Sequence, residues 1–230
     1  MSLIDPGLFK GEPSDTGARP FSSPYAPGAG PLGAGFKDPR RATRALVAVL
    51  GFHIPATALI LVLFSWALAA PEIYEEPIVL ETANVLSWVV TGSTWTSFGL
   101  MLFWFYRANR NARSASTGLE TTPGWAVGFF FIPIMSFYRP YRTISEIWRS
   151  ATEPLSWKSQ EDPAIIGWWW GLYIASALGM ILSRFAEGEA AGPVYLCALA
   201  LGIAESAVLV VIVRYVARRQ WEGKDQSVFD

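Results

Sequence analysis

Two titratable side chains, His53 and Glu205, lie inside long apolar stretches of the sequence. In a helix that rises about 1.5 Å per residue, Glu205 would lie about 13 Å from the membrane boundary near Arg214, and His53 about 12 Å from the boundary at the start of its own stretch. The polar residues that fall near this level by the same counting are Thr96, Ser97 and Tyr173. These five residues predict a buried polar layer in the inner leaflet.

The polar layer has three interpretations. Carboxylates inside a membrane are costly and often functional, so Glu205 is the first candidate for a role. A neutral Glu205 bonded to neighbouring hydroxyls would fasten helices together, a His53–Glu205 pair would relay protons, and a partner subunit would contact either residue. We favour the fastener and keep the other two open.

The sequence has few residues that could form a disulfide, bind a metal or carry out catalysis. Because His53 and Cys197 occur as single copies, the chain has no intramolecular disulfide, no His/Cys zinc site and no bis-His haem. No paired carboxylates and no nucleophile with its base appear at a usable spacing. The net charge of −1 argues against a nucleic-acid partner. We therefore expect no cofactor, no metal and no enzymatic activity.

The composition is that of a protein with several membrane spans. Of the 230 residues, 52% are apolar and only 16% are charged. About 20 helical residues cross the hydrocarbon, in which a helix satisfies its own backbone. The runs of sufficient length are residues 45–70, 82–106, 163–183 and 192–213. We predict an all-α integral membrane protein with four transmembrane helices.

A fifth apolar segment, residues 124–138, does not cross in this prediction. Its 15 residues reach only about 22 Å as a helix, and Pro133 would break that helix. If the segment returns to its starting side, 17 of the 18 Lys and Arg residues share one side, whereas a crossing divides them 10 to 8. Since Lys and Arg gather in cytoplasmic loops, we expect a re-entrant or interfacial segment and both termini in the cytoplasm, in a bacterial inner membrane.

An amphipathic helix follows at residues 140–151. Tyr141, Ile144 and Trp148 recur at helical spacing, with Glu146 and Arg149 on another face. We expect an interfacial helix; the alternative is a buried helix of a small cytoplasmic cap.

The run from Pro123 to Ala151, with the pattern of Tyr106, Arg107, Ala108, Asn111, Ala112 and Arg113 before it, resembles the bacterial membrane proteins of domain of unknown function 4328. The residues that carry the resemblance are Trp125, Gly128, Pro133, Pro140, Tyr141, Glu146, Trp148 and Arg149. The resemblance implies a bacterial protein with several spans. It implies no activity, because none is assigned to that family.

Small residues at every fourth position predict helix contacts, because helices in lipid associate through close backbone approach. The third span carries Gly167, Gly171, Ala175, Gly179 and Ser183, and the fourth carries Ala198, Gly202 and Ser206. We expect these two spans to pack as an antiparallel pair. Trp104 and the three Trp at 168–170 are placed in the aromatic belt at the inner interface.

The regions outside the spans predict contacts with other molecules. Residues 1–40 form a Pro/Gly-rich cytoplasmic arm that would order on a partner, residues 41–220 the membrane domain, and residues 221–230 a cytoplasmic tail. Arg40, Arg41 and Arg44 beside the first span would bind anionic lipid headgroups.

For the function, we expect an accessory or assembly subunit of a larger membrane complex that contacts its partner subunits through the arm and the spans. The alternative is a small ion- or proton-conducting component that uses the polar layer around His53 and Glu205.

Overall fold

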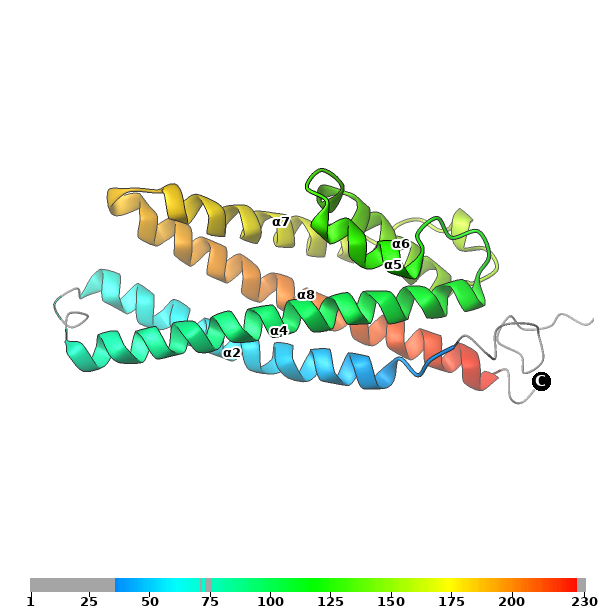
Figure 1. Ribbon diagram of the computed structural model, residues 1–230, viewed down its shortest axis with the longest axis horizontal. Helices are drawn as coiled ribbons and strands as arrows, with labels where there is room; N and C mark the ends of the chain where they lie inside the picture. Colours follow the sequence, from blue (N-terminus) through cyan, green and yellow to red (C-terminus); the bar gives the residue numbers. More distant parts are fainter. Residues whose placement is uncertain (1–35, 71, 73–75, 227–230) are drawn as a thin grey trace, which may run out of the picture.

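The computed structural model describes residues 36–70, 72 and 76–226, and in these ranges it contains helices and no strands. Four long helices run alongside one another (Figure 1). They are α2 (Arg40–Ala69), α4 (Pro77–Ala115), α7 (Ala164–Phe185) and α8 (Ala191–Gln226). All four are long and apolar enough to cross a membrane. The prediction of an all-α membrane protein with four spans is confirmed.

Local sequence explains where the spans begin and why they continue. Pro77 lies in the first turn of α4, where its missing N–H leaves no hydrogen bond unmade. The hydroxyl-rich part of α4 stays helical because its side chains bond to carbonyls one turn earlier: Thr94 donates to Val90 O at 2.9 Å and Thr96 to Gly92 O at 2.8 Å. These polar residues therefore do not interrupt the span.

The helices form two hairpins, α2/α4 and α7/α8, that meet where α2 packs on α8. The ends of α2 and α7 and the starts of α4 and α8 lie at one end of the molecule (Figure 1). At the other end α2 begins and α4 and α8 end, whereas the shorter α7 begins nearer the middle of the molecule (Figure 1). Arg40 lies in the first turn of α2, Arg113 in the last turn of α4, and Arg218 about two turns before the end of α8. We call this second end the basic end and the first the hairpin end.

Packing is unequal between the two ends. The main apolar core lies toward the basic end and includes Leu46, Trp104, Phe105, Ile147 and Ile212, each at most 1% exposed. Toward the hairpin end the core shrinks to a small cluster of Ile60, Val90 and Leu199. The hairpins are thus held together mainly at the basic end.

The segment between α4 and α7 folds back on the basic end. Its helices are α5 (Pro123–Gly128), η1 (Phe129–Phe131), η2 (Met135–Phe137), α6 (Arg139–Thr152) and η3 (Trp157–Ser159). Phe130 packs edge-on against Phe105 of α4, with 5.3 Å between ring centroids, and Trp170 of α7 donates from Nε1 to Phe137 O at 2.9 Å. The segment is therefore tied to the spans that precede and follow it. Its depth in the bilayer stays a prediction.

Helix α6 is more buried than an interfacial helix would be. Ile144 and Ile147 are fully buried, and Glu146, expected on a solvent-facing side, is only 4% exposed. The reason is that α6 packs on both α4 and α8 and thus has two buried faces. This burial agrees with the alternative of a buried helix in a small cap, while the position of α6 relative to the membrane surface stays a prediction.

The ladder of small residues on α7 only partly faces α8. A Cβ added to Gly179 would lie 2.9 Å from the Ala198 side chain, and one added to Gly202 would lie 3.1 Å from Ser176 Oγ, so the backbones approach closely there. Gly167 and Gly171, in contrast, are exposed, and an added Cβ would meet nothing within 4 Å. Positions four apart advance by about 40° around a helix, so a five-residue ladder winds away from one partner.

The topology can be tested by cysteine labelling in a Cys197→Ser background, since Cys197 is the one cysteine of the chain. We expect Arg41→Cys and Leu155→Cys to react with an impermeant maleimide from one side of the membrane, and Glu187→Cys from the other. The reason is that Leu155, 63% exposed, follows the segment that folds back on the basic end, whereas Glu187 lies between α7 and α8. Reaction of Leu155→Cys from the side of Glu187→Cys would contradict the four-span topology.

Candidate functional site

A cavity of about 320 Å³ lies between the two hairpins, within the spans. Three of the five residues of the predicted polar layer line it: His53 from α2, Tyr173 from α7 and Glu205 from α8. Thr96 has an exposed side chain bonded within its own helix, and the buried Ser97 hydroxyl has no hydrogen-bond partner in the described structure. Neither of these two lines the cavity.

Glu205 is held by a neighbour from the other helix of its hairpin. Its Oε1 accepts a hydrogen bond of 2.7 Å from Nε1 of Trp169, a residue of α7 that is fully buried. Its Oε2 accepts a longer bond of 3.3 Å from Ser206 Oγ. This arrangement fastens α7 to α8. Trp169 was missed as a partner because all three consecutive Trp residues were assigned to an interfacial belt. Of the three, only Trp168 is exposed, at 71%.

His53 makes the corresponding link in the other hairpin. Ser93 of α4 donates its hydroxyl hydrogen to Val90 O at 2.8 Å, so its oxygen accepts from Nδ1 of His53 at 2.8 Å. The Nε2 atom is then free to accept from Thr57 Oγ1 at 3.4 Å. This pattern describes a neutral imidazole with its hydrogen on Nδ1, joining α2 to α4.

The two fasteners face each other across the cavity without touching. No hydrogen bond joins His53 to Glu205 among the described residues, so a proton cannot pass directly between them. The hydroxyl of Tyr173, which also lines the cavity, makes no hydrogen bond within the described chain, although its ring stacks on Trp170 with 5.1 Å between centroids. The cavity thus presents a donor that has no partner among the described residues.

The cavity continues toward the hairpin end. A second cavity of about 360 Å³ shares Ile60, Ser87 and Tyr195 with the first. On the side where α2 meets α8 it is bounded by Phe64 and Tyr195, whose rings pack edge-on at 5.2 Å. We call the two cavities together the hairpin cleft.

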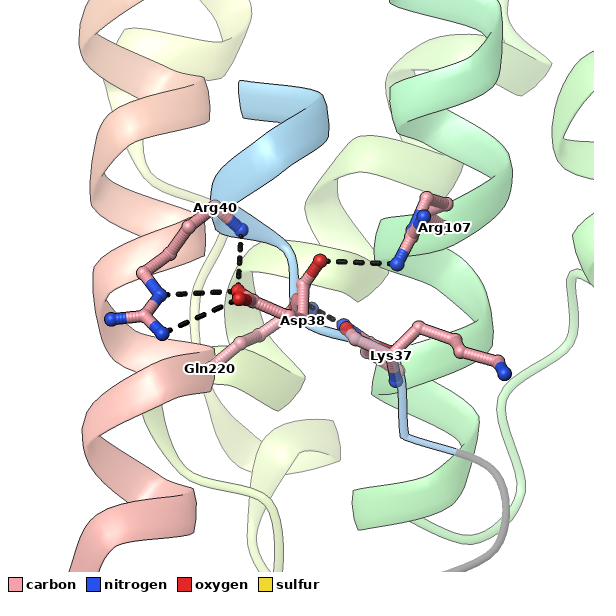
Figure 2. Close-up of polar contacts among 6 residues, drawn as sticks. Lys37, Asp38, Arg40, Arg107 and Gln220 are labelled. Atoms are coloured by element: carbon pink, nitrogen blue, oxygen red, sulfur yellow. Dashed lines mark hydrogen bonds and ion pairs between the residues drawn. The ribbon is translucent and has the colours of Figure 1, made fainter. Parts of the chain in front are cut away.

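A polar network at the basic end anchors the residues that precede α2 (Figure 2). Asn111 of α4 binds both backbone groups of Lys37, accepting from its N–H at 3.0 Å and donating to its carbonyl at 2.8 Å. Asn111 also donates to Gln220 of α8 at 3.2 Å, and Arg107 donates to Asp38 O at 3.1 Å. The network joins α4, α8 and residues 37–38, which we call the strap. Arg107 and Asn111 belong to the pattern at the end of the second span that accompanied the family resemblance, which was their signal in the sequence.

The strap also positions Arg40, one of the three arginines predicted to bind lipid headgroups. Asp38 accepts from the Arg40 backbone N–H at 2.9 Å and from its Nε at 3.1 Å. Burial acts to raise the pKa of Asp38, but the hydrogen bonds and charge of Arg40 outweigh it and keep that pKa below its ordinary value. Arg44 lines a pocket beside Arg40, whereas Arg41 is exposed and lies outside that pocket. Residues 1–35 of the predicted arm and residues 227–230 of the tail lie outside the described residues.

The residues that carried the family resemblance hold the region from α5 to η3 together. Trp148 stacks on Tyr215 of α8 with 3.9 Å between ring centroids, and Arg149 pairs with Asp162 at 3.3 Å. Tyr141 donates to the same Asp162 at 3.3 Å. The others have local roles: Trp125 stacks on Phe129, Gly128 lies close to the Trp125 ring, Pro133 is in the exposed turn, and Pro140 is in the first turn of α6.

Glu146 is the buried acid of this region. Its Oε2 accepts from the Thr121 backbone N–H at 3.2 Å, which ties the α4–α5 connection to α6. Burial raises the pKa of Glu146 above its ordinary value of 4.5, and the nearby charge of Glu120 acts in the same direction.

Comparison with known families agrees with this architecture. Residues 78–220, which cover α4 through most of α8, match the family model described as Domain of unknown function (DUF4328). The chain belongs to this DUF4328 family. No curated protein and no solved structure matches the chain. The DUF4328 match includes Glu205, Trp169 and the family-pattern residues, and leaves out α2 with His53 and the strap.

The pKa of Glu146 predicts a pH-dependent stability. Because the folded state holds this proton more tightly than the unfolded state, the stabilisation is present below the ordinary pKa of 4.5 and is lost as pH rises through the raised folded value. As pH rises through this range, we expect the melting temperature of Glu146→Gln to fall less than that of wild type. The reason is that the amide accepts the hydrogen bond from Thr121 but has no proton to lose. Glu161→Gln, an exposed control, should follow wild type. Parallel curves for wild type and Glu146→Gln would refute this role.

Proposed function

We propose that this protein is an assembly subunit of a larger bacterial membrane complex, and that a transmembrane helix of its partner inserts a polar side chain into the hairpin cleft. The observation that carries the proposal is the polar lining of the cleft, above all the Tyr173 hydroxyl with no hydrogen bond in the described chain. Lipid tails offer no hydrogen bonds, and an unsatisfied polar group in hydrocarbon is costly. A partner side chain would supply the missing bond.

The outer surface of α7 supports the same proposal. Gly167, Gly171 and Ala175 are exposed and turn away from both α8 and the cleft, with exposed Trp168 beside them. Three small residues in succession allow another backbone to come close at these positions, with Trp168 at their edge. Together with the cleft it provides a second surface on which a partner helix could pack.

We also propose the orientation that places the basic end in the cytoplasm of a bacterium. The support is charge: Arg184 is the one Lys or Arg near the hairpin end, and the first connection there, residues 71–77, carries three Glu and no Lys or Arg.

Site-specific photo-crosslinking in native membranes tests the assembly role. A photoreactive amino acid at Ser87, which lines both cavities of the cleft, should yield a protein adduct of one defined mass. The same probe at Val85, 57% exposed on another face of α4, is the matched control and should not yield it. The adduct should weaken when Glu205→Leu is added, because that change alters the cleft wall. An equal adduct from both positions, or lipid adducts alone from Ser87, would overturn the proposal.

Proton conduction is the second candidate function, favoured by the presence of His53 and Glu205 on the wall of one cavity. Because they do not touch, such a path needs water between them. Glu205→Gln separates the two functions, since an amide accepts a hydrogen bond from Trp169 but does not cycle a proton.

If Glu205 is a fastener, Glu205→Gln should keep most of the thermal stability, and Glu205→Leu should lose about 1 kcal/mol, the typical size of a polar contact between membrane helices. Proton flux into liposomes should then be the same for wild type and both variants. Conduction instead requires wild-type flux that Glu205→Gln, Glu205→Leu and His53→Gln all abolish, and that result would replace the fastener with the relay.

A further inference from the structure

Four arginines from two helices surround a pocket of about 480 Å³ at the basic end. Arg40 and Arg44 come from the first turns of α2, and Arg214 and Arg218 from the last turns of α8. Trp221 and Glu222 complete one wall. We call it the arginine pocket. It is separate from the hairpin cleft, with which it shares no lining residue.

The charges of the pocket are only partly balanced by the residues that the structure describes. Arg40 pairs with Asp38 at 3.1 Å, and Arg218 pairs with Glu222 at 2.7 Å. Arg44 and Arg214 form no ion pair with any residue that the structure describes. Two guanidinium groups therefore remain available for an anion, and their planar sets of N–H donors match the oxygens of a phosphate.

One wall of the pocket is already fixed in place. The Arg40 guanidinium lies 3.4 Å above the Trp221 ring, while Asp38 binds the same side chain from the strap. The strap itself is held by Asn111 and Arg107 of α4 (Figure 2). Thr43 accepts from Trp104 Nε1 at 3.0 Å, which positions the floor. Side chains ordered before binding lose less entropy when a ligand arrives.

The position of the pocket beside the spans favours the phosphate of a lipid over that of a soluble molecule. The apolar spans of α2 and α8 run directly from it, and Val211, one turn before Arg214, is 53% exposed on the membrane-facing part of α8. A lipid headgroup in the pocket would leave its acyl chains alongside these helices. We propose that the arginine pocket binds the phosphate of an anionic phospholipid, with Arg44 and Arg214 as its direct ligands.

Lipid titration of the detergent-purified full chain tests this site. Binding of phosphatidylglycerol, counted by native mass spectrometry, should exceed that of phosphatidylcholine. Arg44→Gln and Arg214→Gln should each weaken phosphatidylglycerol binding by roughly fivefold and together by about 30-fold, from the usual contribution of one basic residue at a membrane surface. The double Lys variant, which keeps the charge, should lose much less. Both arginines are exposed, so folding does not depend on them.

The control is Arg41→Gln, which removes an arginine from the same helical turn but outside the pocket. It should leave phosphatidylglycerol binding unchanged. An equal loss in Arg41→Gln would show a diffuse surface charge and overturn the site, as would equal binding of the two lipids. If inorganic phosphate protects the protein against heat and phosphatidylglycerol does not, the ligand is a soluble anion and the lipid assignment is wrong.

Discussion

The absence of hydrogen-bonding partners in hydrocarbon is the constraint on which this structure depends. Every polar group inside a span must find a partner within the protein or lie against something that provides one. Each hairpin satisfies this rule internally for its one deeply placed titratable group, His53 with Ser93 in α2/α4 and Glu205 with Trp169 in α7/α8. Between the hairpins, the Tyr173 hydroxyl lacks such a partner among the described residues. A partner helix in the cleft would provide one.

At the basic end this constraint is weaker, because water and headgroups can hydrogen-bond to polar groups there. Strongly polar side chains are nevertheless buried in it: Asn111 and Gln220 are each 1% exposed and bonded to each other. The packing of α6 against α4 and α8 makes this possible by covering the ends of the spans with protein. The family-pattern residues lie in that cover, which indicates that the DUF4328 match describes this cap together with the spans beneath it.

Depth along a span could be predicted from the sequence, whereas direction around it could not. Hydropathy located the four helices, and counting residues gave similar depths to His53, Tyr173 and Glu205, which line the same cavity. Thr96 and Ser97 have nearly the same depth, yet one is exposed and the other buried, since neighbouring residues differ by about 100° around a helix. Trp169 and the outward part of the α7 ladder escaped prediction for the same reason.

The strap has a consequence for the order in which the chain is completed. Lys37 and Asp38 precede every span, but Asn111 lies 74 residues after Lys37, and Gln220 lies a further 109 residues along. During synthesis, the strap can therefore bind α4 once that helix is made, whereas the network waits for α7 and α8 before Gln220 completes it. The stacking of Arg40 on Trp221 closes last and marks a fully translated domain. A ribosome stalled before α8 would leave the beginning of the first helix attached to α4 alone, with Arg40 not yet stacked on Trp221.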